Sequence, residues 1–330
     1  MSGRLLLLLL AVLAEPAGAQ RREERFYLPG SFNWSFLHRY PEAARLFNAF
    51  DYGHAVLYER LYAEPGAPAD RLERAEFDFL TSDLLRHPPK FAIAEEAVAP
   101  RYSRLAWRAM QMFHWAHLLH RQIYDVYADE RIPAAEKPAL VERITDYYLS
   151  NRDLAFTPVP KTMELMDEAY YSQVFRERYP RFNGLIWAYH WLQVGLYEPL
   201  IGAESVAGRA AGIHEAVEHF WAMVAAQGRG FPQVMPMTPS VAPRFTARHP
   251  RAAAIFDNLH MMHDIISDIL ASDRVPRAGK AKAIEAALAE FRDGSKDTMS
   301  AEEWREMAGM MGGVGRMGGV AWPIARPPVP

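Results

Sequence analysis

Two pairs of histidines in this chain have the spacing of metal ligands on one face of a helix. His117 and His120 form one pair, and His260 and His263 form the other. Residues three apart in an α-helix lie on the same side, one turn apart. Imidazole nitrogen is a ligand for zinc, copper and iron. The sequence therefore predicts that these four side chains build a metal centre where two helices face each other.

The two pairs belong to segments that resemble each other. Residues 113–137 and 256–280 are related by a constant offset of 143, and ten of these 25 positions are identical. Both segments run on to an Arg-aliphatic-Pro element, Arg131 to Pro133 and Arg274 to Pro276. We predict an internally duplicated helix-turn-helix unit at about 101–150 and 250–292. Such a pair can place ligands across a pseudo-twofold axis, as metal-binding helical bundles do.

Carboxylates extend the candidate ligand set. Asp257 precedes His260 by three residues, and the same D-x-x-H spacing recurs at Asp51 and His54. His114 and Glu218 are candidates because they share helix faces with other histidines, and they are weaker than the others. His190 lines up with His117 at an offset of 73 but, taken alone, is expected to be a packing residue. The predicted metal ligands are His117, His120, His260, His263, Asp257, Asp51, His54, His114 and Glu218.

A second interpretation of the same residues needs no metal. Buried histidines can form a hydrogen-bonded network with Asp and Tyr, in a non-catalytic exported scaffold that binds a protein or an apolar ligand. Each imidazole buried without a partner costs about 1–3 kcal/mol. Four histidines at equivalent positions of two apolar helices therefore favour metal ligation, while the scaffold stays the alternative.

Helical periodicity dominates the elements that must position these residues. Apolar residues recur at helical spacing, and no segment alternates with the period of a strand. Prolines mark most helix boundaries. The predicted fold is all-α, a multi-helix bundle, with Trp107 on the apolar flank of the first histidine helix. The expected helices are at about 41–62, 69–86, 101–129, 134–150, 161–178, 182–198, 204–227, 250–272, 277–292 and 300–310.

The two ends of the chain differ in composition from the rest. Residues 1–19 combine a basic start, an apolar run and a small-residue site, the pattern of a secretory signal peptide. We expect an exported protein, periplasmic or extracellular, without a transmembrane segment, because the apolar run is shorter than the roughly 20 residues of a membrane span. Residues 20–308 are the predicted helical domain, with two pseudo-symmetric halves as an option. Residues 309–330, rich in Gly, Met and Pro, are predicted to be a flexible tail.

Composition narrows the chemistry. The chain has no cysteine, so only nitrogen, oxygen and thioether ligands are available. A net charge of −3 without a basic stripe excludes a nucleic-acid partner, and no nucleotide-binding or nucleophile motif is present. The sequence predicts an exported metal-binding protein holding iron, copper, manganese or zinc. Oxygen-linked redox chemistry or metal-assisted hydrolysis would suit an enzyme, and haem b between His117 and His260 is a less favoured cofactor.

Overall fold

The computed structural model describes residues 24–319 except 66, 227 and 228. The predicted signal peptide and residues 320–330 of the predicted tail lie outside the described residues. The described part is built from helices and contains no β-strand, with one antiparallel bridge between Lys161 and Thr298. The prediction of an all-α, multi-helix bundle is confirmed.

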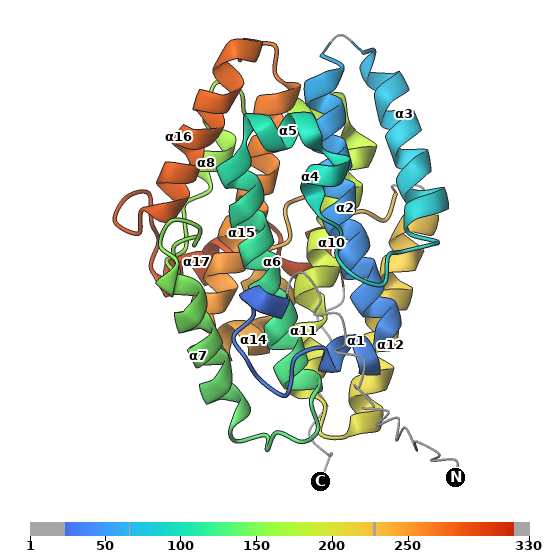
Figure 1. Ribbon diagram of the computed structural model, residues 1–330, viewed down its shortest axis with the longest axis vertical. Coiled ribbons are helices and arrows are strands. Elements are labelled where there is room, and N and C mark those ends of the chain that lie inside the picture. The colour runs from blue at the N-terminus through green and yellow to red at the C-terminus, as the bar shows by residue number, and fades with distance from the viewer. Residues whose placement is uncertain (1–23, 66, 227–228, 320–330) are drawn as a thin grey trace, which may run out of the picture.

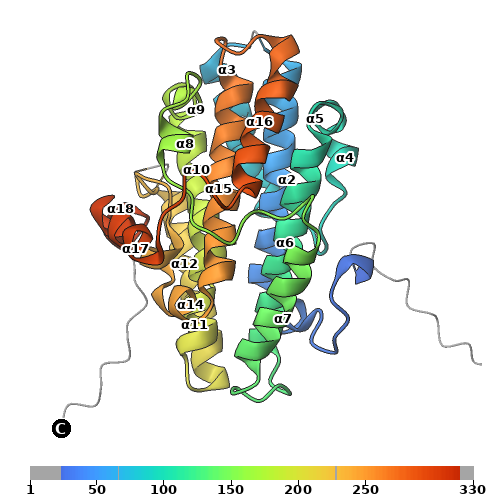
Figure 2. The same ribbon diagram turned by 90° about the vertical axis from the view of Figure 1, so that its left-hand side faces the viewer.

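Four long helices run side by side through the centre of the molecule (Figures 1 and 2). They are α2 (Pro41–Ala63), α6 (Trp107–Ala128), α10 (Pro180–Gly195) and α15 (Pro250–Ala271). Each follows a short helix, and these are α1 (Ser35–Arg39), α5 (Pro100–Leu105), α9 (Val174–Arg178) and α14 (Pro243–Arg248). A single junction residue separates each short helix from its long one, with φ between −128° and −135° and ψ between 50° and 61°. Proline follows three of the four junctions, where a missing N–H costs nothing.

A carboxylate locks each short helix onto a neighbouring long one. The acid is the nineteenth residue counted from the start of each long helix, and its oxygens accept backbone N–H groups at the start of a short helix. Asp125 accepts from Trp34 and Phe36 at 2.9 and 2.8 Å, and Asp268 accepts from Gln173 and Phe175 at 2.9 and 2.7 Å. Glu59 and Glu198 do the same for α5 and α14.

These contacts are reciprocal within two pairs of helices. The acid of α6 holds the start of α1, which leads into α2, while the acid of α2 holds α5, which leads into α6. The pair of α10 and α15 is held in a similar way. Asp268 of α15 holds α9, which leads into α10, and Glu198, three residues beyond the end of α10 and part of α11 (Tyr197–Gly202), holds α14, which leads into α15. Hydrogen bonds to charged acceptors are stronger than neutral ones. The carboxylates therefore set the axial register of each pair, so that equal positions lie at equal heights.

Shorter helices and connections surround this bundle. Helix α7 packs on α6, α16 packs on α15, and α12 packs on α10 and α11. A π-helical turn at Leu80–Leu84 continues α3. The surrounding helices are α3 (Ala69–Phe79), α4 (Glu95–Val98), α7 (Lys137–Ser150), α8 (Glu164–Asp167), α11 (Tyr197–Gly202), α12 (Val206–Ala225), α13 (Thr238–Val241), α16 (Lys280–Arg292), α17 (Ala301–Met310) and α18 (Gly313–Arg316).

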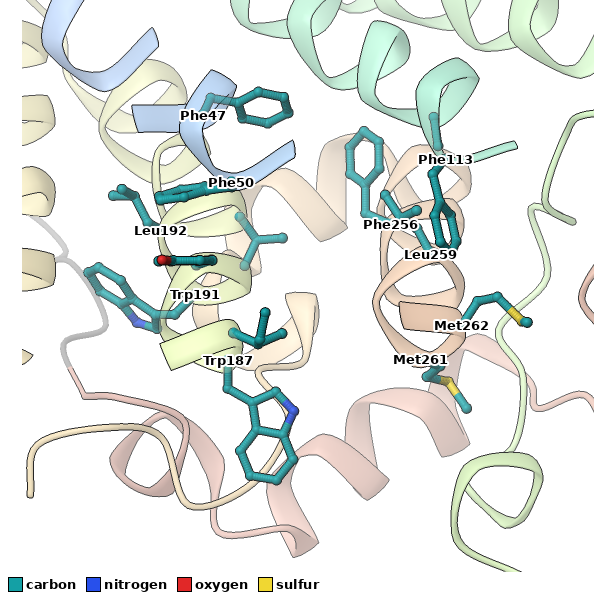
Figure 3. Packing of buried hydrophobic residues seen from close by; sticks show 14 of the residues in the cluster. Phe47, Phe50, Phe113, Trp187, Trp191, Leu192, Phe256, Leu259, Met261 and Met262 are labelled. Carbon is teal, nitrogen blue, oxygen red and sulfur yellow. The ribbon is translucent and has the colours of Figure 1, made fainter. Parts of the chain in front are cut away.

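The core is continuous across all four long helices. Figure 3 shows aromatic and aliphatic side chains of the four long helices that belong to this core, among them Phe50, Phe113, Trp191 and Phe256. Every residue of α10 from Phe182 to Gly195 is buried. None of the helices in the described ranges has the length and apolar character needed to cross a membrane.

The two predicted helix-turn-helix units share local geometry. Lys137 Nζ donates to the carbonyl of Tyr127 at 2.9 Å, and Lys280 Nζ donates to the carbonyl of Leu270, the corresponding position, at 3.1 Å. The side chain of residue 129 or 272 accepts the N–H two residues later in each turn. Common descent of the two units stays a prediction.

Several predicted boundaries were wrong. The expected helix at 161–178 is α8 and α9 with a loop between them, because Gln173 takes a left-handed φ of 67° before α9. The expected helices at 101–129 and 182–198 each break at one residue, Ala106 and Leu196. Trp107 is 56% exposed rather than part of the core, because it is the first residue of α6 at a junction.

The described part of the predicted tail is packed. Met317 is fully buried, and its sulfur accepts the backbone N–H of Met237 at 3.3 Å. Trp191 Nε1 donates to the carbonyl of Gly319 at 3.1 Å. Up to residue 319 the chain therefore lies against α10 and the connection before α13.

Candidate metal centre

The four long helices place eight side chains in one layer of the bundle. Counted from the first residue of each helix, these are the eleventh and fourteenth positions. Three residues apart, the two members of each pair face the same way, toward the bundle axis. The layer consists of Asp51 and His54 on α2, His117 and His120 on α6, His190 and Gln193 on α10, and His260 and His263 on α15.

All eight side chains are buried, with relative exposures of 5% or less. The imidazole rings are in mutual contact: His54 and His263 stack at 4.3 Å between ring centroids, and His190 and His260 at 4.0 Å. His117 lies 5.6 Å from His263 by the same measure. Six histidines therefore meet in the interior of one helical bundle.

Three of them form a group that suits a metal ion. One nitrogen atom from each of His54, His190 and His263 lies within 4.8 Å of the other two. Metal–nitrogen bonds of about 2.1 Å need these atoms within about 4 Å of one another, so the nitrogens would move closer together by less than about 1 Å on binding. The three ligands come from three different helices, α2, α10 and α15.

The inward nitrogens of this group have no protein partner in the described part of the chain. His190 and His263 have both ring nitrogens unpaired, and His54 has its Nε2 unpaired. His54 Nδ1 lies 2.8 Å from the carbonyl oxygen of Phe50, so it must carry the proton and donate. That hydrogen bond fixes the tautomer and leaves the Nε2 lone pair available to a metal.

Burial keeps these imidazoles neutral, which metal ligation requires. Desolvation lowers the pKa of His54 to about 4 and lowers the pKa of His190 and His263 well below the ordinary value. Positive charge on neighbouring histidines of the cluster lowers the pKa of His190 and His263 further. At neutral pH each of these imidazoles is therefore uncharged and keeps one nitrogen lone pair that a metal ion can bind.

On the other side of the layer, Asp51 and His120 have protein partners, whereas both ring nitrogens of His117 and His260 and both amide atoms of Gln193 have none among the described residues. Asp51 Oδ2 accepts a close hydrogen bond from the Arg121 guanidinium, and Asp51 Oδ1 lies 3.1 Å from His117 Nδ1. The latter pair lacks hydrogen-bond geometry. The Tyr197 hydroxyl lies 2.8 Å from His120 Nδ1. Asp51, predicted as a metal ligand, is thus engaged by a cation of the protein itself.

Three predicted ligands lie away from this layer. Asp257 accepts hydrogen bonds from Thr238 and from Trp304 Nε1, which ties α13 and α17 to α15. His114 is half-buried and lines a surface pocket, one turn before His117. Glu218 is exposed on α12. These residues were predicted as ligands from their helical spacing. Their positions around the helix axis direct their side chains away from the layer.

His190 and Gln193 are the members of the layer that the sequence prediction did not include. The signal for them was the offset of 73 from His117, which continues to the aligned pairs Tyr124 with Tyr197 and Asp125 with Glu198. Glu198 proves to be the carboxylate that holds α14. The alignment had therefore identified a structural counterpart of α6.

The packing of the rings disfavours haem. His260, one of the two expected axial ligands, is covered by His190 with an angle of 8° between the rings. His120 is covered in the same way by Phe256 at 3.3 Å. A macrocycle between axial imidazoles needs a wide planar space that these stacked rings fill. The layer suits a metal ion bound directly by imidazole.

Protonation of His54 is expected to destabilise the metal-free protein as the pH falls from 7.5 to 5. The pKa of His54 is about 4 in the fold and 6.5 as its ordinary value, so the unfolded chain takes up the proton first. The contribution of His54 to the free energy of unfolding is therefore unchanged above pH 6.5 and declines toward pH 4, with a loss of about 2 kcal/mol by pH 5.

Urea unfolding of wild type and His54→Gln at both pH values, with chelator present, measures this contribution. Burial raises the pKa of Asp125, Asp257 and Asp264 to about 7 and that of Asp268 to about 6, and these groups act in the opposite direction. The difference between wild type and variant isolates His54. An identical pH response of the two proteins would contradict the assignment of a neutral, desolvated imidazole.

No protein-family model matches this chain, and neither a curated protein nor a solved structure matches it.

Proposed function

We propose that this chain is an exported metalloprotein whose centre is a transition-metal ion bound by His54, His190 and His263. The observation that carries the proposal is a set of neutral, buried imidazoles whose inward nitrogens have no protein partner and converge within 4.8 Å. Leaving them without a ligand costs about 1–3 kcal/mol for each nitrogen. A bound metal ion offsets that cost.

The ligand chemistry favours copper, iron or zinc. Imidazole suits these metals, whereas manganese prefers carboxylate and water. The layer holds one carboxylate, Asp51, and Arg121 already engages it. Three protein ligands leave the fourth tetrahedral position to a small molecule, an arrangement typical of catalytic rather than structural sites.

The surroundings of the centre favour oxygen-linked redox chemistry over hydrolysis. Phe113 lies 4.2 Å from His263, and Phe50 stacks on Tyr189 at 4.2 Å beside the cluster. These residues are at most 2% exposed. A buried apolar shell admits a small apolar molecule such as dioxygen far more readily than a charged or bulky hydrolytic substrate.

Export is part of the proposal because of the signal-like residues 1–19. A centre without thiolate ligands suits an oxidising compartment, because imidazole has no sulfur that oxidation would destroy. The chain has no cysteine anywhere in its 330 residues.

Reaction of the reduced metal with dioxygen tests the redox proposal. The protein is loaded with copper(I) or iron(II) under argon and mixed with oxygenated buffer in a stopped-flow spectrophotometer. We expect an absorbance change that needs both the metal and oxygen, and none in the zinc-loaded protein. A reduced metal that is bound but unreactive toward oxygen would make the centre structural.

The alternative is the non-catalytic scaffold. One observation favours it: the hydroxyl groups of Tyr102 and Tyr189 are also buried without a hydrogen-bond partner among the described residues, although neither of them belongs to a cluster of metal ligands. In that case the histidines would be packing residues, and no metal would bind at stoichiometric level.

A further inference from the structure

The layer of eight side chains contains two corresponding sets of three. The sets are found by pairing α2 with α10 and α6 with α15, and by matching residues that have the same position counted from the start of their helix. This pairing maps His54 onto Gln193, His190 onto Asp51, and His263 onto His120. The group of His54, His190 and His263 is called set A here, and the group of Gln193, Asp51 and His120 is called set B.

The two sets differ in the charge that the protein places beside them. Set A has the unpaired nitrogens described above and no charged partner. In set B, the Arg121 guanidinium donates to Asp51, and His120 Nδ1 is 2.8 Å from the Tyr197 hydroxyl. Gln193 supplies an amide where α2, α6 and α15 place imidazole at the fourteenth position, and this amide has no partner among the described residues.

Arg121 is the charged residue beside set B that has no counterpart beside set A. It is the fifteenth residue of α6, and the corresponding residues of the other helices are Ala55, Val194 and Asp264, none of them a cation. Its guanidinium also donates to Asn48 Oδ1 at 3.3 Å and lies over the ring of Phe47 at 4.9 Å. A guanidinium stays charged at any pH that proteins tolerate.

We infer that Arg121 is the built-in cation of set B and keeps the centre mononuclear. Its permanent charge neutralises Asp51, and it repels a second metal ion from the ligands on that side, since like charges in a buried site interact strongly. Set A then binds one metal ion, and set B binds none. This inference rests on the proposed metal centre in set A.

Cobalt(II) titration tests it, because tetrahedral cobalt gives visible absorption bands that can be counted per protein. Wild type is expected to bind one equivalent. In Arg121→Met, which keeps a long side chain without the charge, Asp51 loses the cation that engages it, and two equivalents are expected. Arg178→Met removes an exposed arginine that pairs with Asp273 and should leave one equivalent.

Two equivalents in wild type, or one in Arg121→Met, would overturn the inference. No binding by wild type would instead reject the metal centre itself, so the two failures are distinguishable. Asp51→Asn gives a second measurement that does not depend on the folding of Arg121→Met. Retention of one equivalent supports the inference, and its loss would make Asp51 a ligand of the first metal and overturn it.

Discussion

Replacing His190 with alanine is expected to lower the affinity for a transition metal by at least about 100-fold. Loss of a residue that only orients a ligand already costs 10 to 100-fold in affinity, and His190 supplies one of the three converging nitrogens. Isothermal titration of the metal-free protein with zinc or copper, against a competing chelator, measures the change.

Two further histidines serve as controls for this substitution. His214 is exposed on α12, and His214→Ala should bind metal like wild type. His120→Ala is the sharper comparison, because the four-histidine centre expected from the sequence includes His120 and set A does not. Metal loss in His120→Ala with full binding in His190→Ala would contradict set A.

Removal of the metal is expected to lower the midpoint of thermal unfolding by about 6 °C. A ligand that binds only the folded state at about 1,000 times its Kd stabilises it by about 4 kcal/mol. The unfolding entropy of a chain of this length is about 0.7 kcal/mol per kelvin, so each kcal/mol corresponds to about 1.5 °C. Circular dichroism of metal-loaded protein, scanned with and without a strong chelator, measures the shift.

The same scan on His190→Ala separates ligation from packing. The variant lacks a ligand, so chelator should leave its midpoint unchanged, although the cavity left by the imidazole lowers stability under both conditions. A chelator shift as large in the variant as in wild type would place the stabilising metal elsewhere.

Helical period and proline positions were enough to predict the architecture. The long helices begin at Pro41, Pro180 and Pro250, and the histidine pairs recur with the spacing of one face. The junctions before these helices were not predictable, because each depends on a single residue with ψ near 60° and on a carboxylate that lies far away in the chain. Asp125 and Trp34, for example, are 91 residues apart.

The sequence predicted that several histidines from different helices lie together, but it did not identify all residues of the buried layer. Spacing located His54, His117, His120, His260 and His263 in a common layer, since each lies at the eleventh or fourteenth position of its helix. Spacing alone could not assign His190, which has no second histidine beside it. Nor could it exclude Asp257, whose partners Thr238 and Trp304 come from other helices.

Arg121 shows why ligand type alone does not identify a ligand. Asp51 and His54 share a D-x-x-H turn, yet His54 lies with the unpaired nitrogens of His190 and His263, whereas Asp51 faces the Arg121 guanidinium of α6. Only the fold brings a cation to one side of the layer and none to the other.

Metal content of the purified protein tests the central claim most directly. Wild type, His190→Ala and His214→Ala are expressed side by side, dialysed to remove loosely bound ions, and measured by inductively coupled plasma mass spectrometry. We predict about one equivalent of copper, iron or zinc in wild type and His214→Ala, and almost none in His190→Ala. Wild type without stoichiometric metal, and unable to take it up after reconstitution, would contradict the metal centre and favour the scaffold.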